Sequence, residues 1–225
     1  MSGLNTSHKL FWVSSLLNLV GNFMGLDPLA MVAKPFLMIS LAHYFWYETE
    51  HRRKLANIFS VALLCSWMGD IFLIWGHIKV CFLVGLISFA IAHILYGFTF
   101  LKVAVTRSRQ FKPLVLVGGV LVLVFAFTYG RFLWEHTGAM KIPVLVYLVI
   151  IVSMALSALF RYGATGTSSY FLTVFGCVLF MASDSILAYA KFVKSFYFDG
   201  FAIMLTYILG QWFLTRGMIA HGKES

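Results

Sequence analysis

The chain has 225 residues, of which 61% are hydrophobic and only 11% charged, with a formal net charge of +9 and a mean hydropathy of +0.89. So few charges could not cover the apolar surface of a water-soluble domain of this size, and the composition therefore favours a membrane protein. The basic residues fall in short segments between apolar runs, which argues against a nucleic-acid-binding groove. Three cysteines are too few for a disulfide framework.

Eight apolar segments are long enough to span a membrane as a helix, which takes about 20 mostly apolar residues. They cover residues 9–26, 29–47, 55–75, 82–101, 113–130, 143–161, 169–190 and 200–219. Asp27-Pro28 indicates a tight first turn, and Pro113 and Pro143 stand where spans five and six begin, because proline is tolerated in the first turn of a helix. No long polar linker interrupts the series. We therefore predict an all-α, polytopic bundle of eight transmembrane helices in a single domain over residues 1–225.

The lysines and arginines of the loops predict the orientation of the chain, because cytoplasmic loops carry an excess of both. With the N-terminus inside, the cytoplasmic segments hold Lys9, Arg52, Arg53, Lys54, Lys102, Arg107, Arg109, Lys112, Arg161, Arg216 and Lys223. The opposite side holds Lys79, Arg131, Lys141, Lys191 and Lys194. The bias predicts that both termini are cytoplasmic. For a bacterial chain, the expected location is the inner, or cell, membrane.

Two aspartates interrupt otherwise apolar spans, Asp70 in span three and Asp184 in span seven. A charge at the middle of a membrane costs about 2.5–3.5 kcal/mol on insertion scales, so both are expected to face the interior of the bundle and to have partners. At 1.5 Å per residue, Asp70, Asp184, Lys34 and Tyr207 fall within about one helical turn of one another in depth. The sequence therefore predicts a polar cluster in the outer half of the bundle.

Further polar residues lie inside the spans near this depth or closer to the middle of the membrane. They are Asn22, His93, Tyr96, Tyr147, Ser183 and Gln211. Each also has a structural interpretation: Lys34 could form a buried salt bridge with either aspartate, His93 could be a hydrogen-bonded packing residue, and the tyrosines could be structural. These alternatives stay open at the level of the sequence.

The residue types narrow the chemistry that such a cluster could perform. Neither H-x-x-x-H nor C-x-x-C occurs and only His93 is well placed, so we expect no metal, with a zinc site formed by His93 and the two aspartates as the open alternative. No G-x-S-x-G is present to indicate a serine hydrolase. Two carboxyl groups close together in a low-dielectric pocket should titrate apart, so that one keeps its proton near neutral pH beside an anionic partner. The pattern is typical of a general acid paired with a stabilising carboxylate.

Five short motifs resemble the YhhN family of polytopic membrane proteins, and the resemblance covers nearly the whole chain. They are Lys34-Pro35, Gly69-Asp70, His93-x-x-Tyr96, Ser183-Asp184 and Tyr207-x-x-x-Gln211. Characterised members are lysoplasmalogenases. The resemblance thus implies hydrolysis of the vinyl ether bond of lysoplasmenyl-ethanolamine or -choline to a fatty aldehyde and glycerophosphoethanolamine or glycerophosphocholine, without a known cofactor. The two intramembrane aspartates of the family correspond to Asp70 and Asp184, with Ser183 standing where the first motif has Gly69.

Two other classes of protein compete with the enzyme. Intramembrane Asp and Lys residues also serve as proton relays in carriers, so a proton-coupled transporter of a lysolipid or small solute is the main alternative. A non-catalytic lipid-binding protein is the other. The expected partners are a vinyl ether lysophospholipid and the membrane lipids, with no nucleic acid, and the sequence gives no oligomeric state.

Overall fold

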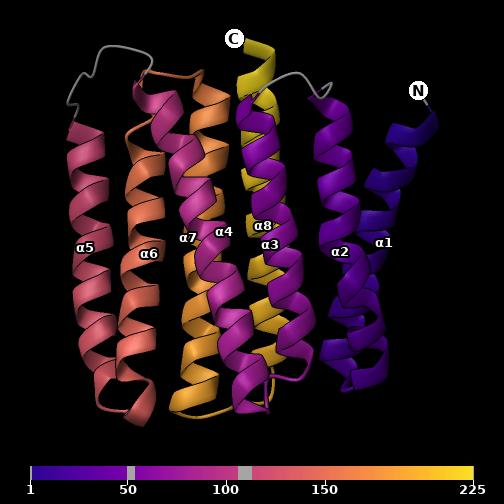
Figure 1. Ribbon diagram of the computed structural model, residues 1–225, viewed down its shortest axis with the longest axis vertical. Helices are drawn as coiled ribbons and strands as arrows, with labels where there is room; N and C mark the ends of the chain where they lie inside the picture. Colours follow the sequence, from indigo (N-terminus) through magenta and orange to yellow (C-terminus); the bar gives the residue numbers. More distant parts are fainter. Residues whose placement is uncertain (1, 50–53, 106–112, 225) are drawn as a thin grey trace. The chain divides into compact units, whose positions relative to one another are not determined.

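The computed structural model describes residues 2–49, 54–105 and 113–224, which form eight α-helices and one short 3-10 turn and contain no strand (Figure 1). The helices are α1 (Ser2–Met24), α2 (Asp27–Glu48), α3 (Lys54–Ile74), α4 (Lys79–Val105), α5 (Pro113–Trp134), α6 (Lys141–Leu159), α7 (Thr167–Phe192) and α8 (Asp199–Glu224). The all-helical prediction is confirmed. Of the loop cations used to predict orientation, Arg52, Arg53, Arg107, Arg109 and Lys112 lie outside the described residues.

Each predicted span coincides with one helix, although several helices extend beyond the apolar run. Helix α1 begins at Ser2 rather than near residue 9, and α4 and α5 end at Val105 and Trp134. The extensions of α4 and α5 carry the exposed side chains of Lys102 and Arg131, whose long stems suit a helix end at a membrane–water interface. Among the described residues, six helices, α2 to α7, are long and apolar enough to cross a membrane. The protein is therefore a multi-pass integral membrane protein.

Exposed apolar side chains are abundant, as expected of helices that face lipid. Helix α5 buries only Val115 and Leu133, while most of its other large apolar residues are exposed. Such a surface would be unfavourable in water and is favourable in a bilayer. All three cysteines are free, in agreement with the expectation of no disulfide framework.

The chain divides into two compact units, Met1–Tyr96 and Gly97–Ser225, with the boundary inside α4. In the first unit α1 packs on α2 and α2 packs on α3. In the second unit α5 packs on α6, α6 on α7 and α7 on α8 (Figure 1). A single domain over residues 1–225 stays a prediction.

Glycine and proline define the sharp turn between α1 and α2. Gly25 has φ 69°, a left-handed conformation that residues with a β-carbon rarely adopt. The Leu26 amide donates to the Gly21 carbonyl at 2.8 Å, the long bond of a Schellman C-cap. Pro28 then stands in the first turn of α2, where it loses no helical hydrogen bond. A tight turn is therefore present, but it lies at Gly25-Leu26, two residues before the predicted Asp27-Pro28, because Pro28 starts α2 rather than preceding it.

Candidate functional site

Asp70 is the buried acid of the first unit. Its side chain is only 3% exposed on α3. Lys34, half-buried on α2, lies within electrostatic range of Asp70. Next to Lys34 the Pro35 carbonyl accepts a 2.8 Å hydrogen bond from the Trp67 indole, which ties α2 to α3 one helical turn from Asp70. The structure thus brings together Lys34 and Asp70, two of the residues predicted to share a cluster.

Close packing against Phe89 explains why a glycine, Gly69, precedes Asp70. A β-carbon at this position would lie 2.6 Å from the Phe89 ring of α4, so only a residue without a side chain permits this approach. A β-carbon at Gly85 would similarly lie 2.9 Å from Leu73. The two glycines let α3 and α4 pack closely beside Asp70, as small residues do in membrane helix interfaces.

His93 and Tyr96 of α4 are both fully buried. The Tyr96 hydroxyl lies 3.5 Å from the Ser66 hydroxyl, which is one helical turn before Asp70 on α3. The Tyr96 ring also packs on Phe59 at 4.9 Å between centroids. Tyr96 is therefore held in place near the acid by contacts on its ring and its hydroxyl.

Asn22 belongs to the contact between α1 and α2. Its amide donates to the Asn18 carbonyl at 2.8 Å, and the buried Asn18 amide donates to the Ala30 carbonyl at 2.8 Å. These two bonds satisfy a backbone carbonyl on each helix. Asn22 thus bonds within α1, beside the Asn18 bond that joins α1 to α2, and its role at the substrate stays a prediction.

Asp184 is the acid of the second unit, and its position on α7 is fixed by three neighbouring helices. The Tyr147 hydroxyl of α6 donates to Asp184 Oδ2 at 2.6 Å. The hydroxyl of Ser183 donates to the Ile203 carbonyl of α8 at 3.0 Å, and the Tyr129 hydroxyl of α5 donates to the Ser185 carbonyl at 2.5 Å. Three consecutive residues of α7 thus each bond to a different helix, which leaves the acid little freedom to move.

Tyr207 and Gln211 lie on α8, one turn apart, and both are buried. The Tyr207 ring meets Phe180 edge-on, at 5.4 Å between centroids. Phe180 precedes Asp184 by one helical turn on α7. The second unit therefore groups Tyr147, Ser183 and Asp184 at one level, with Tyr207 beside the next turn.

The sequence interpretation missed Arg161, which it counted among the loop cations. The side chain follows α6 and is 0% exposed. Its guanidinium donates to Ser169 Oγ at 2.8 Å and to Thr173 Oγ1, and it lies 5.4 Å from the centre of the Phe100 ring. The signal available in the sequence was the pair of hydroxyls at i and i+4 at the start of α7. Trp67 and Tyr129 were missed because the carbonyls that they bond come from residues distant in the sequence.

No group of three or more His, Cys, Asp or Glu side chains is placed to hold a metal ion within the part of the chain that the structure describes. The side chains near the two acids are the ammonium of Lys34, close to Asp70, and the phenol of Tyr147, which bonds to Asp184. Both acids lie on helices rather than loops, which favours fixed geometry.

The sequence pattern of the YhhN family matches residues 29–218. The chain belongs to the YhhN family. The matched region contains every residue of the predicted site except Asn22. The Lys34-Pro35 and Gly69-Asp70 motifs of this YhhN protein accompany a close α2–α3 contact and a close α3–α4 contact.

Several curated relatives of this YhhN protein share the name lysoplasmalogenase. The chain is 28% identical to human Lysoplasmalogenase TMEM86B over 83% of its own length and 74% of that protein. It is 31% identical to bovine Lysoplasmalogenase TMEM86A, over 76% of the chain and 68% of the relative. For rat Lysoplasmalogenase TMEM86B the identity is 34%, over 68% of the chain and 58% of the relative. No solved structure matches the chain.

Proposed function

We propose that the protein is a lysoplasmalogenase, which hydrolyses the vinyl ether bond of lysoplasmenyl-ethanolamine or -choline. The products are a fatty aldehyde and glycerophosphoethanolamine or glycerophosphocholine. The observation that carries the proposal is the similarity to proteins named lysoplasmalogenase over most of the chain. The buried Asp70 and the half-buried Asp184 support it, because each has a side-chain neighbour that can tune an acid, Lys34 for the first and Tyr147 for the second.

The chemistry of the bond explains why acids are needed. A vinyl ether resists nucleophiles until the carbon beta to the oxygen is protonated, which converts the ether into an oxocarbenium ion. Water then adds to the carbon attached to the oxygen and releases a proton, and the hemiacetal collapses to an aldehyde and a glycerol hydroxyl. The proton of the acid ends in the methylene group next to the aldehyde. Paired carboxylates perform comparable steps in glycosidases.

In this proposal one of Asp70 and Asp184 protonates the carbon, and the other stabilises the cation and accepts the proton from water. Lys34 sets the charge beside Asp70, and Tyr147 orients the carboxyl group of Asp184. His93, Tyr96, Ser183, Tyr207 and Gln211 shape the polar surroundings of the two acids. No metal or cofactor takes part.

We also propose that all eight helices span the membrane and that both termini are cytoplasmic. Helices α1 and α8, with 23 and 26 residues, are about 34 and 39 Å long, enough for a hydrocarbon core of about 30 Å. Polar residues that make them less apolar, among them Asn18, Gln211 and Thr215, are buried within the protein. Reporter fusions at each terminus test the orientation, and an extracytoplasmic terminus would contradict it.

Product analysis tests the activity. Purified protein is incubated with a lysoplasmalogen in deuterated water, and the aldehyde is reduced at once and analysed by mass spectrometry. The proposal predicts an aldehyde with one deuterium on the carbon next to the carbonyl, and no product from the matched saturated alkyl ether. Proton-coupled flux of lysolipid into vesicles without aldehyde would instead support the transporter. Unchanged lysolipid without flux would support a binding protein.

A further inference from the structure

A hollow lies at the turn that joins α5 to α6, in the second unit. Its walls include Leu133, Trp134, Thr137, Lys141, Leu145 and Leu148. The space between the walls is about 230 Å³ and part of it is open to the outside. Its deepest part has room for about one water-sized group. The hollow therefore suits a ligand that inserts a single small group between α5 and α6.

Thr137 places a polar group in the wall of this hollow. Its side chain is 5% exposed, and its hydroxyl is buried without a hydrogen-bond partner. A buried polar group without a hydrogen bond costs about 1–3 kcal/mol. A ligand that forms a hydrogen bond with the Thr137 hydroxyl would remove this cost, which favours its binding. The hydroxyl of Thr137 is thus a ready donor for an acceptor oxygen.

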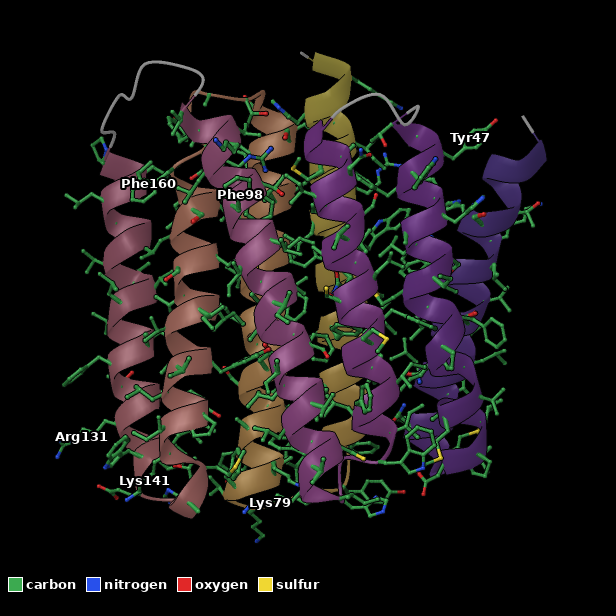
Figure 2. All side chains as sticks on the ribbon, viewed as in Figure 1. Tyr47, Lys79, Phe98, Arg131, Lys141 and Phe160 are labelled. Carbon is green, nitrogen blue, oxygen red and sulfur yellow. The ribbon has the colours of Figure 1, made fainter. Side chains whose placement is uncertain are left out.

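The charges around the hollow favour an anion. Lys141 begins α6, and its ammonium lies 5.2 Å from the centre of the Trp134 ring. Arg131 is exposed on the last turn of α5, and Figure 2 shows Arg131 and Lys141 at the same end of the α5–α6 hairpin. The start of α6 has no side-chain cap, and although the Lys141 amide donates to the Gly138 carbonyl, the positive end of the helix dipole favours an anion there. Glu135, the acidic residue of this turn, is exposed and does not line the hollow.

We propose that this hollow takes up one oxygen of the phosphate group of a lysophospholipid, with the rest of the phosphate at its open side. The inference rests on the proposed function and assigns its headgroup subsite to Lys141 and Thr137, supported by Arg131. Under this assignment Lys34 does not bind the phosphate, and its charge acts on Asp70. The apolar wall formed by Leu145 and Leu148 contacts the first carbons of the lipid.

The spacing along α6 agrees with this assignment. Lys141 and Tyr147 are six residues apart, which corresponds to about 9 Å along the helix axis. Tyr147 is bonded to Asp184, an acid of the proposed reaction. The glycerol backbone and the ether oxygen that separate the phosphorus atom from the vinyl carbons have a comparable length. A lipid with its phosphate at Lys141 therefore brings its reactive bond to the level of Asp184.

Binding rather than turnover tests the subsite. Protein in lipid nanodiscs is titrated with three radiolabelled ligands: a saturated alkyl-ether lysophosphocholine, which has no vinyl ether bond, the corresponding alkylglycerol, and glycerophosphocholine. Wild-type protein should bind the lysophosphocholine about tenfold more tightly than the alkylglycerol, because only the former carries a phosphate. Lys141→Gln should abolish most of this preference, and the isosteric Thr137→Val should reduce it by about threefold. Binding of the alkylglycerol should not change.

Lys194→Gln is the matched control, because Lys194 is an exposed lysine of the same unit that does not line the hollow. The inference is overturned if Lys141→Gln and Thr137→Val keep the wild-type preference, or if Lys194→Gln reduces it equally. Glycerophosphocholine binding as tightly as the lysolipid would also overturn it, since the site would then recognise a soluble phosphate ester. A failure of the proposed reaction would appear only in the aldehyde assay, so the two failures are distinguishable.

Discussion

Tyr147 donates a 2.6 Å hydrogen bond to Asp184 and so connects α6 to the acid of α7. One residue further along α7, Tyr129 donates a 2.5 Å bond to the carbonyl of Ser185. The two tyrosines approach the same stretch of α7, yet only Tyr147 contacts a carboxyl group. Substitutions at Tyr147 and Tyr129 can therefore distinguish an effect on the Asp184 carboxyl group from an effect on helix packing.

Tyr147→Phe should lower kcat for aldehyde release by about 10- to 100-fold, because the carboxyl group of Asp184 loses the bond that orients it. Tyr129→Phe should change kcat by less than about threefold, since it removes a bond to the backbone only. Steady-state kinetics with a lysoplasmalogen measure both values. Equal losses in the two variants would mean that Tyr147 acts through packing rather than through Asp184.

Lys34→Met should lower the thermal stability of the detergent-solubilised protein, because it removes a cation within electrostatic range of the buried Asp70 carboxyl group. The double variant Lys34→Met with Asp70→Asn should lose at least about 1 kcal/mol less than the sum of the single variants. Lys79→Met is the control for charge, because Lys79 is an exposed lysine of the same unit. Additive losses in the double variant would rule out coupling between Lys34 and Asp70.

Much of the fold could be predicted from the sequence, because spanning helices leave long apolar runs and proline and glycine define their ends. The α1–α2 turn, predicted at Asp27-Pro28 and found two residues earlier at Gly25-Leu26, is an example. The partners of the acids were harder to assign. Depth along a helix could be counted, but the direction in which a side chain points depends on how neighbouring helices rotate. The bond from Tyr147 to Asp184 joins residues 37 positions apart, and no spacing rule predicts it.

Gly176→Ala should destabilise the protein by about 1–3 kcal/mol, because the close contact between α7 and α8 leaves no room for a methyl group. A β-carbon at Gly176 would lie 2.8 Å from the backbone nitrogen of Leu214. At Gly119 on α5, the nearest atom would be 3.8 Å away, in Leu156, so Gly119→Ala should be neutral or stabilising. Thermal melting in detergent compares the two, and equal stability of both variants would contradict the close packing.

Arg161→Met should destabilise the protein by about 2–4 kcal/mol, because it leaves the hydroxyls of Ser169 and Thr173 without their charged donor. Arg161→Lys should recover only part of the loss, since an ammonium cannot reproduce the forked geometry of a guanidinium. Arg216, an exposed arginine over the Trp212 ring, provides the control variant Arg216→Met. A melting temperature for Arg161→Met as high as that of Arg216→Met would show that the buried arginine contributes nothing to stability.

The aldehyde that Asp70→Asn and Asp184→Asn release from a lysoplasmalogen tests most directly whether the two aspartates together hydrolyse the vinyl ether. Asparagine keeps the shape of the side chain but can neither donate the acidic proton nor carry the negative charge. Each variant should lose at least about 100-fold in kcat while it elutes and melts as a folded protein. Full activity in both folded variants would contradict the mechanism.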